Sequence, residues 1–384
     1  MYYLDNAATT WPKPECVYKA LDENFRQMFS PKRGTAKAAR MGADKLTEAR
    51  QGIARMFNMA NPERVIFTAG CTYSLNIAVH AFPWEKDDAV VISAVEHHAL
   101  SRPIRKLAKE KGIRFHVVPY TDDMPFDLAA CEQLLKTDSR IRMIATTHAS
   151  NVIGSVMPVA EIGKLARQYG KTYLVDAAQT AGVLPVDVRA MNIDMLALPG
   201  HKSLYGPPGM GVLYVAEGVK LNTVFEGGTG NDSGKHDAHA TVPDGFEVGT
   251  IALPQILALA EGVRWVEETG LEKIHRHETQ LLAQLLEGLK QRPDVTIYGH
   301  TDILRKTPVV SFNVGNLNPK ELGTKLFDEF GIALRAGFHC APMAHEAIGT
   351  IARGGTIRAS LGWFTKAEDV DALLSALKQV RCPA

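Results

Sequence analysis

The sequence predicts an α/β protein, in which a large domain with a mostly parallel sheet covered by helices is joined to a smaller α+β domain. Between residues 64 and 176, short apolar runs alternate with helical stretches, a pattern typical of a parallel sheet with helices on both faces. The chain of 384 residues also exceeds the size that one hydrophobic core usually supports. We therefore expect two domains.

Composition and charge exclude several classes of protein. Apolar residues make up 46% of the chain and charged residues 22%, as in ordinary soluble domains. The net charge of +1 argues against nucleic acid or an anionic membrane as the main partner. No apolar run approaches the roughly 20 residues of a membrane span, and Asp5 stands where a signal peptide would be hydrophobic. We expect a cytoplasmic protein.

The five cysteines lack the paired spacing of a zinc site or a disulfide framework. We therefore expect no metal site and a reducing compartment. A small apolar filler or a chance thiol is the default interpretation for four of them: Cys16, Cys71, Cys131 and Cys382.

The elements of the N-terminal part follow from local signals. The first ten residues read as extended, and Pro12 and Pro14 delay a helix that begins near Glu15. Residues 29–41 lack an apolar period and predict a loop, whereas residues 44–58 predict an amphipathic helix. Its apolar positions at helical spacing are Leu46, Ala49, Ile53 and Phe57.

Short apolar runs predict the strands of the large sheet, at residues 65–67, 89–92, 115–118, 143–146 and 172–175. Ligands of such sheets bind beyond the carboxyl ends of the strands. Polar motifs follow four of these strands directly, at residues 68–72, 96–98, 148–151 and 176–179. The sequence therefore predicts a binding site along this edge.

A glycine-rich segment at residues 227–234, closed by residues 246–250, predicts a domain boundary near residue 251. The large domain is then residues 15–250, and the small domain is residues 1–14 and 251–384. In the small domain we expect helices at 255–268 and 271–290, strands at 308–314 and 332–335, and a last strand and helix ending near Leu377.

Lys202 lies in a glycine-rich turn between two expected strands, residues 194–198 and 211–215. A loop lysine is usually solvated; the alternative is a Schiff-base lysine held against an aldehyde cofactor. Asp176 ends an apolar run 202 − 176 = 26 residues earlier, and enzymes that use pyridoxal 5'-phosphate (PLP) place an acid against the pyridine nitrogen. Together with His201, these residues favour a PLP site.

Beyond these residues, the chain resembles fold-type I, class V aminotransferase-like PLP enzymes. Within that group it is similar to the cysteine desulfurases and selenocysteine lyases. The resemblance runs nearly end to end and implies a homodimer. It rests on seven motifs in the order that the family has, at residues 3–10, 96–99, 150–154, 176–179, 200–202, 335–341 and 357–361.

The resemblance implies how the cofactor ring is held. Lys202 carries PLP, and Asp176 faces the pyridine nitrogen. His97 stacks on the ring and shuttles protons, although the sequence alone allows it to cap a helix or face solvent. Gln179 contacts the phenolic oxygen, and Asn151 lies near that oxygen and the substrate carboxylate.

A second group of residues is expected to bind the phosphate of the cofactor. Gly70-Cys71-Thr72 opens a helix directly after a strand, where free backbone N–H groups suit an anion. By resemblance, Cys71, Thr72 and His201 hold the phosphate, and Ser233 reaches it from the neighbouring subunit. Family members often carry serine where this chain has Pro199, and Ser233 could compensate for that loss.

Arg358 and Cys340 are the residues assigned to substrate chemistry. Arg358 lies on an apolar run, where its planar fork suits an amino-acid carboxylate, while an internal salt bridge is the alternative. Cys340 follows His339 in a turn and is a candidate thiolate nucleophile. The surrounding motif is similar to that of the group II, SufS-like desulfurases, with Phe338 where many relatives have histidine. The role of Arg335 stays open.

The implied function is PLP-dependent removal of sulfur from L-cysteine, giving L-alanine and a persulfide on Cys340 for transfer to an acceptor protein or reductant. Two alternatives remain within the fold: a selenocysteine lyase and another PLP-dependent carbon–sulfur lyase. A non-catalytic protein on a degenerate PLP fold is disfavoured, because Lys202, Asp176 and Arg358 are all present.

Overall fold

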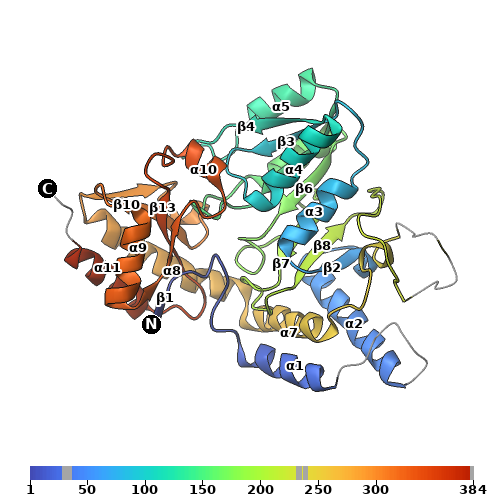
Figure 1. Ribbon diagram of the computed structural model, residues 1–384, viewed down its shortest axis with the longest axis horizontal. Coiled ribbons are helices and arrows are strands. Elements are labelled where there is room, and N and C mark those ends of the chain that lie inside the picture. The colour runs from blue at the N-terminus through green and yellow to red at the C-terminus, as the bar shows by residue number, and fades with distance from the viewer. Residues whose placement is uncertain (28–36, 231–235, 237–240, 381–384) are drawn as a thin grey trace.

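The computed structural model describes residues 1–27, 37–230, 236 and 241–380 (Figure 1). A seven-stranded sheet with its covering helices forms the larger part, and a four-stranded sheet with three long helices lies beside it. In these ranges no helix is both long enough and apolar enough to cross a membrane.

The seven-stranded sheet has the order β2-β8-β7-β6-β5-β3-β4. Only β8 runs against its neighbours, so the prediction of a mostly parallel sheet is confirmed. The strands are β2 (Val65–Thr68), β3 (Ala89–Ser93), β4 (Arg114–Val118), β5 (Ile141–Thr147), β6 (Thr172–Asp176), β7 (Met195–Pro199) and β8 (Gly211–Val215).

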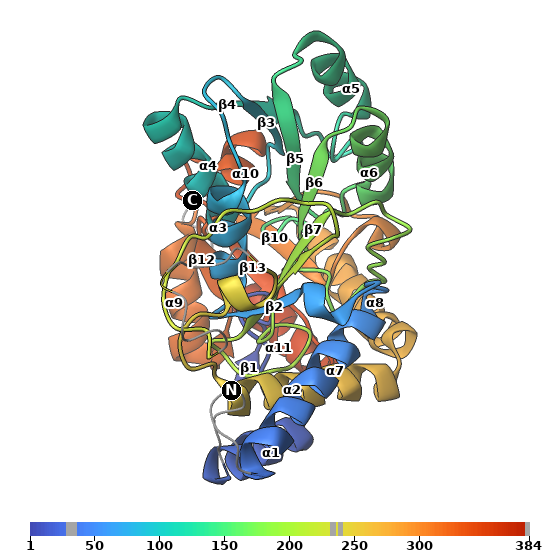
Figure 2. The ribbon, with the colours of Figure 1, turned by 90° about the vertical axis from the view of Figure 1, so that its right-hand side faces the viewer.

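The inner strands of this sheet are buried on both faces, which explains why they are mostly apolar runs, whereas the edge strand β4 is partly exposed. In β6, Tyr173 and Val175 pack into one core cluster, and Leu174 packs into the other. Helices of the two clusters flank the strands in Figure 2. One face is covered by α2 (Lys37–Met56), α5 (Leu128–Thr137), α6 (Val159–Gln168) and α7 (Leu253–Thr269), and the other by α3 (Cys71–Ala81) and α4 (His98–Lys111).

The four-stranded sheet is antiparallel, in the order β12-β13-β10-β9. A third core cluster fills the space between it and its helices. Its strands are β9 (Val295–Tyr298), β10 (Val309–Val314), β12 (Arg335–Gly337) and β13 (Thr356–Ser360). Its helices are α8 (Leu271–Lys290), α9 (Pro319–Phe330) and α11 (Ala367–Gln379).

The N-terminal segment joins the C-terminal part of the chain. β1 (Tyr2–Tyr3) pairs in parallel with β11 (Ile332–Ala333), and the amide of Ser360 donates to the carbonyl of Leu4 over 2.8 Å. The chain then crosses to the large sheet through α1 (Glu15–Arg26), which packs on α7. The remaining helices are α10 (Pro342–Ala347) and three short 3-10 helices, η1 (Pro62–Arg64), η2 (Asp244–Phe246) and η3 (Ile303–Arg305).

Two expectations about local structure were wrong. Residues 37–41, expected in a loop, begin α2, because Ala39 and Arg40 have high helix propensity and Ala39 packs inward. The run at residues 332–335, expected to be one strand, is divided between two sheets, since β11 pairs with β1 and β12 pairs with β13.

The domain boundary near residue 251 stays a prediction. Helix α7 follows that residue directly, and it packs on α1, α2 and the core of the seven-stranded sheet. Side chains that α7 adds to this core are Leu253, Ile256, Leu259 and Val263.

Helix α7 also packs against the turn that contains Lys202. Because of this contact, we expect a larger side chain at Gly262 to destabilise the protein. A Cβ atom there would lie 2.2 Å from the carbonyl oxygen of Leu204. We expect Gly262→Ala to lower the free energy of unfolding by about 1–3 kcal/mol, the usual cost of overpacking, as measured by urea denaturation.

Gly52→Ala in α2 is the matched control, because its nearest non-neighbouring atom would be an Arg55 side-chain nitrogen at 3.9 Å. It should be neutral or stabilise by up to about 1 kcal/mol. Equal effects of the two substitutions would contradict the packing of α7 on the turn.

Candidate active site

A turn between β7 and β8 presents Lys202. The Gly206 amide donates to the Gly200 carbonyl and the Tyr205 amide donates to the Lys202 carbonyl, each over 2.8 Å. This arrangement confirms that Lys202 lies on the connection between two strands. A short, internally bonded turn fixes the backbone from which the lysine side chain projects.

The N-terminal segment holds this turn by donating hydrogen bonds to its backbone carbonyl oxygens. The hydroxyl of Thr9 donates to the His201 carbonyl over 3.1 Å, and the hydroxyl of Thr10 donates to the Lys202 carbonyl over 2.9 Å. The ammonium group of Lys13 donates to the same His201 oxygen over 2.5 Å. Hydroxyl and ammonium donors thus hold both peptide oxygens next to Lys202.

Lys202 opens into a cavity of about 340 Å³ at the carboxyl ends of the parallel strands. The structure brings most of the predicted site residues together around it. Those lining it are Cys71, Thr72, His97, Asn151, Asp176, Gln179, His201, Lys202 and Arg358, and they are joined by Pro199 and Arg335. Ser233 lies outside the described residues.

Asp176, the last residue of β6, is almost completely buried beside the cavity. Its Oδ1 accepts the Ala178 amide over 2.9 Å and lies 3.5 Å from the Cys71 sulfur. Burial raises the pKa of Asp176 and lowers the pKa of Lys202, while the charge of each group opposes the shift of the other. Burial also raises the pKa of the Cys71 thiol, which therefore stays protonated and donates to Asp176.

His97 caps α4, one of the two possibilities that the sequence alone allowed, and it also lines the cavity. Its Nδ1 accepts the Ala99 amide over 3.0 Å. Burial, reinforced by the charge of Lys202, lowers the pKa of His97 to about 3. The neutral ring therefore carries its proton on Nε2.

Glu96 is a buried carboxyl group that sequence reasoning placed in a motif without a role. Its Oε1 accepts the Ser93 hydroxyl over 2.5 Å and the Thr147 amide over 3.0 Å, which ties the end of β3 to the end of β5. Burial raises the pKa of Glu96 to about 8. Its position directly before His97 was the available signal, because an acid inside an apolar motif needs partners.

The cavity has a positive end suited to an anion. Gly70, with φ of 137°, precedes α3 and lies so close to Gly211 that a Cβ on Gly211 would meet the Gly70 carbonyl carbon at 2.5 Å. The first-turn N–H groups of α3 have no partner within the helix. Thr72, in the first turn of α3, and His201 both line the cavity.

Three buried polar atoms of lining residues have no hydrogen-bond partner among the described residues: His201 Nδ1, Asn151 Oδ1 and Arg358 Nε. Such atoms are normally satisfied by a ligand or water. Together with the lysine, the buried acid and the anion-binding helix end, they fit PLP and a substrate carboxylate. In the described ranges no group of three or more His, Cys, Asp or Glu side chains could hold a metal ion.

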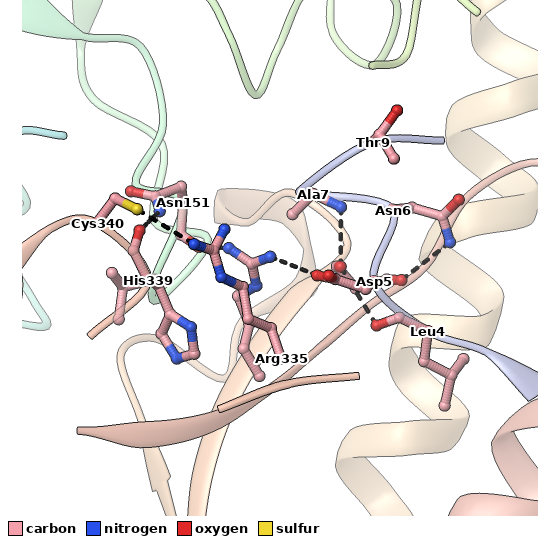
Figure 3. Close-up of polar contacts among 12 residues, drawn as sticks. Leu4, Asp5, Asn6, Ala7, Thr9, Asn151, Arg335, His339 and Cys340 are labelled. Carbon is pink, nitrogen blue, oxygen red and sulfur yellow. Dashed lines mark hydrogen bonds and ion pairs between the residues drawn. The ribbon is translucent and has the colours of Figure 1, made fainter. Parts of the chain in front are cut away.

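Arg358, on β13, makes the internal ion pair that sequence reasoning gave as the alternative, and it also faces the cavity where a substrate carboxylate was expected. Its Nη2 is 2.6 Å from Asp5 Oδ1, an internal ion pair, and the side chain also lines the cavity. Its Nη1 donates to the Asn151 carbonyl over 3.0 Å. The Asn151 side chain in turn donates to the His339 carbonyl over 2.7 Å (Figure 3).

Cys340 is not among the residues that line the cavity, but it lies on a tightly held turn beside Arg335, which does line it. His339 and Cys340 both have left-handed backbone angles, with φ of 48° and 59°, a strain that surrounding contacts must maintain. The His98 amide donates to the Cys340 carbonyl over 2.8 Å. Arg335 Nη2 lies 3.1 Å from the Cys340 sulfur (Figure 3), a contact that the sequence did not reveal.

Comparison with known proteins decides the family. Residues 2–373 match the family model described as aminotransferase class-V. The chain belongs to this family. The family and fold predicted from the sequence are therefore confirmed.

Named relatives cover nearly the whole chain. A probable cysteine desulfurase of Pyrococcus abyssi is 34% identical, over 98% of this chain and 94% of the relative. A cysteine desulfurase of Salmonella typhimurium is also 34% identical, over 98% and 93%. The solved apo structure of a cysteine desulfurase from Thermococcus onnurineus is 31% identical, with a TM-score of 0.90 and coverage of 98% and 94%.

Proposed function

We propose that this protein is a PLP-dependent cysteine desulfurase, which takes sulfur from L-cysteine, leaves L-alanine and holds the sulfur as a persulfide on Cys340. The observation that carries the proposal is one cavity in which Lys202, Asp176 and Arg358 meet, with the Cys340 thiol beside Arg335. Relatives named cysteine desulfurase over nearly the full chain support it.

Different residues around the cavity would contact different parts of the cofactor. Lys202 would bond to it covalently, Asp176 would face the pyridine nitrogen, and Gln179, His97 and Asn151 would contact the ring. Cys71, Thr72 and His201 would surround the phosphate. When bound, PLP supplies an electron sink that acidifies the α-hydrogen of the amino acid.

The protein's own groups then bind the substrate and move its proton. Arg358 binds the α-carboxylate through N–H groups that its internal partners leave free. The lowered pKa of Lys202 favours a neutral amine, which can accept the α-proton at Nζ. His97, whose Nδ1 is occupied by the Ala99 amide, lines the cavity and keeps Nε2–H as its hydrogen-bond donor.

Cys340 accepts the sulfur. The Arg335 guanidinium donates to the Cys340 sulfur over 3.1 Å and so holds the nucleophile in place. The thiolate attacks the substrate sulfur, so that an S–S bond forms while the Cβ–S bond breaks and Cβ gains a proton. L-cysteine and a thiol thereby become L-alanine and a persulfide. A thiol reductant or an acceptor protein then removes the terminal sulfur.

Cys340→Ser tests this assignment. Serine cannot form a persulfide, so we expect alanine production from L-cysteine to fall by more than about tenfold, while the absorbance of bound PLP and the affinity for L-alanine stay unchanged. Cys16→Ser, at a free cysteine on helix α1, is the control and should retain full turnover. Undiminished desulfuration by Cys340→Ser would move the enzyme to the class of plain carbon–sulfur lyases.

We also propose a homodimer, in which Ser233 reaches the phosphate of the neighbouring subunit, and a cytoplasmic location. An apolar groove of about 380 Å³ adjoins the cavity and shares Ala69, Tyr73 and Gly209 with it. Tyr73 and Phe225 are about half exposed on this groove, and a second copy of the chain would cover them.

Sedimentation velocity combined with an activity assay tests the homodimer. We expect a dimer at assay concentrations, because the exposed apolar groove lies directly beside the cavity. A fully active monomer would contradict a shared site.

A further inference from the structure

The ion pair between Arg358 and Asp5 is unusual because its partners come from opposite ends of the chain, 353 residues apart. The Arg358 side chain is 1% exposed and the Asp5 side chain 21%, and Nη2 lies 2.6 Å from Oδ1. Burial lowers the pKa of Arg358, and the Asp5 carboxylate opposes this shift. Asp5 thus stabilises the charge on which a carboxylate site depends.

Asp5 is itself fixed by the backbone around it. It forms an isolated bridge with Ser360, two residues along β13 from Arg358. On either side, the Leu4 amide donates to the Ala333 carbonyl over 2.8 Å, and the Ala7 amide donates to the Ser360 hydroxyl over 2.9 Å. Figure 3 shows Asp5 in the middle of this network. The backbone that carries the Asp5 carboxylate is therefore held in place beside the guanidinium group.

Counting donors shows that Arg358 can bind Asp5 and a ligand together. A guanidinium group has five N–H donors. Within the described residues, one donor of Nη2 goes to Asp5 and one donor of Nη1 goes to the Asn151 carbonyl. Nε is buried without a partner there. The remaining donors are enough for a two-point contact with a carboxylate, so Asp5 does not have to leave.

We propose that Asp5 is a positioning residue for the α-carboxylate of the substrate. It holds the Arg358 guanidinium in the orientation that directs the free N–H groups to the ligand. This inference rests on the proposed role of Arg358 as the carboxylate-binding residue. Asp5 acts only through Arg358, and it does not line the cavity.

Two matched ligands isolate the carboxylate contact. L-alanine and ethylamine differ by the carboxylate alone, and each is titrated into the PLP-loaded full-length protein while the absorbance of the cofactor is followed. We expect Asp5→Asn to raise the Kd for L-alanine by about tenfold, because a charge-assisted contact loses its geometry. The Kd for ethylamine should stay within about twofold.

A double-mutant cycle shows whether Asp5 acts through Arg358. Arg358→Lys should also weaken L-alanine selectively, and adding Asp5→Asn to it should change the Kd by less than about twofold, because coupled residues are not additive. Asn6→Ala is the control: it loosens the same segment by removing a 3.1 Å hydrogen bond to the Ser360 carbonyl, and it should leave both Kd values unchanged.

The other outcomes distinguish a failure of the positioning role of Asp5 from a failure of the carboxylate site at Arg358. If Arg358→Lys weakens L-alanine but Asp5→Asn leaves its Kd unchanged or tightens it, the positioning role is wrong and the carboxylate site stands. Additive effects in the cycle, or an equal effect of Asn6→Ala, would also overturn the positioning role. If Arg358→Lys leaves L-alanine binding unchanged, the proposed carboxylate site fails and the inference about Asp5 falls with it.

Discussion

The hydrogen bonds from the N-terminal segment to the two peptide groups that flank Lys202 are the constraint on which the site depends. The carbonyl oxygens of His201 and Lys202 accept hydrogen bonds from Thr9, Thr10 and Lys13. A few residues earlier, the same segment pairs with β11 and places Asp5 against Arg358. One stretch of chain therefore fixes the amine from the large sheet and the guanidinium from the small sheet relative to each other.

The groups held by this constraint are buried and can carry charge, so it costs free energy to separate them from their partners. Burial shifts the pKa of Lys202, Asp176 and Arg358 in the direction that favours the neutral form. A nearby group of opposite charge opposes each of these shifts. Breaking a buried pair by removing one member typically costs about 3–5 kcal/mol. The arrangement keeps the ligand-binding groups in place before a ligand arrives, which reduces the reorganisation that binding and catalysis would otherwise require.

Sequence reasoning succeeded where a local pattern determines a shared position in space. Runs such as residues 172–175 predicted strands buried on both faces, and the carboxyl ends of parallel strands meet at one edge, so Asp176, His97 and Asn151 were expected together. It failed where pairing is long-range. No local pattern shows that Asp5 meets Arg358, that Arg335 contacts the Cys340 sulfur, or that the run at 332–335 divides between two sheets.

The central claim is that Lys202, on the turn held by the N-terminal segment, is the amine that bonds to PLP. Lys13 provides a strict test, because burial lowers its pKa to about 7 and it contacts the same turn. Borohydride reduction of the PLP-loaded protein, followed by proteolysis and mass mapping of the labelled peptide, identifies the bonded lysine. The account predicts that the label lies on Lys202, and a label on Lys13 would contradict it.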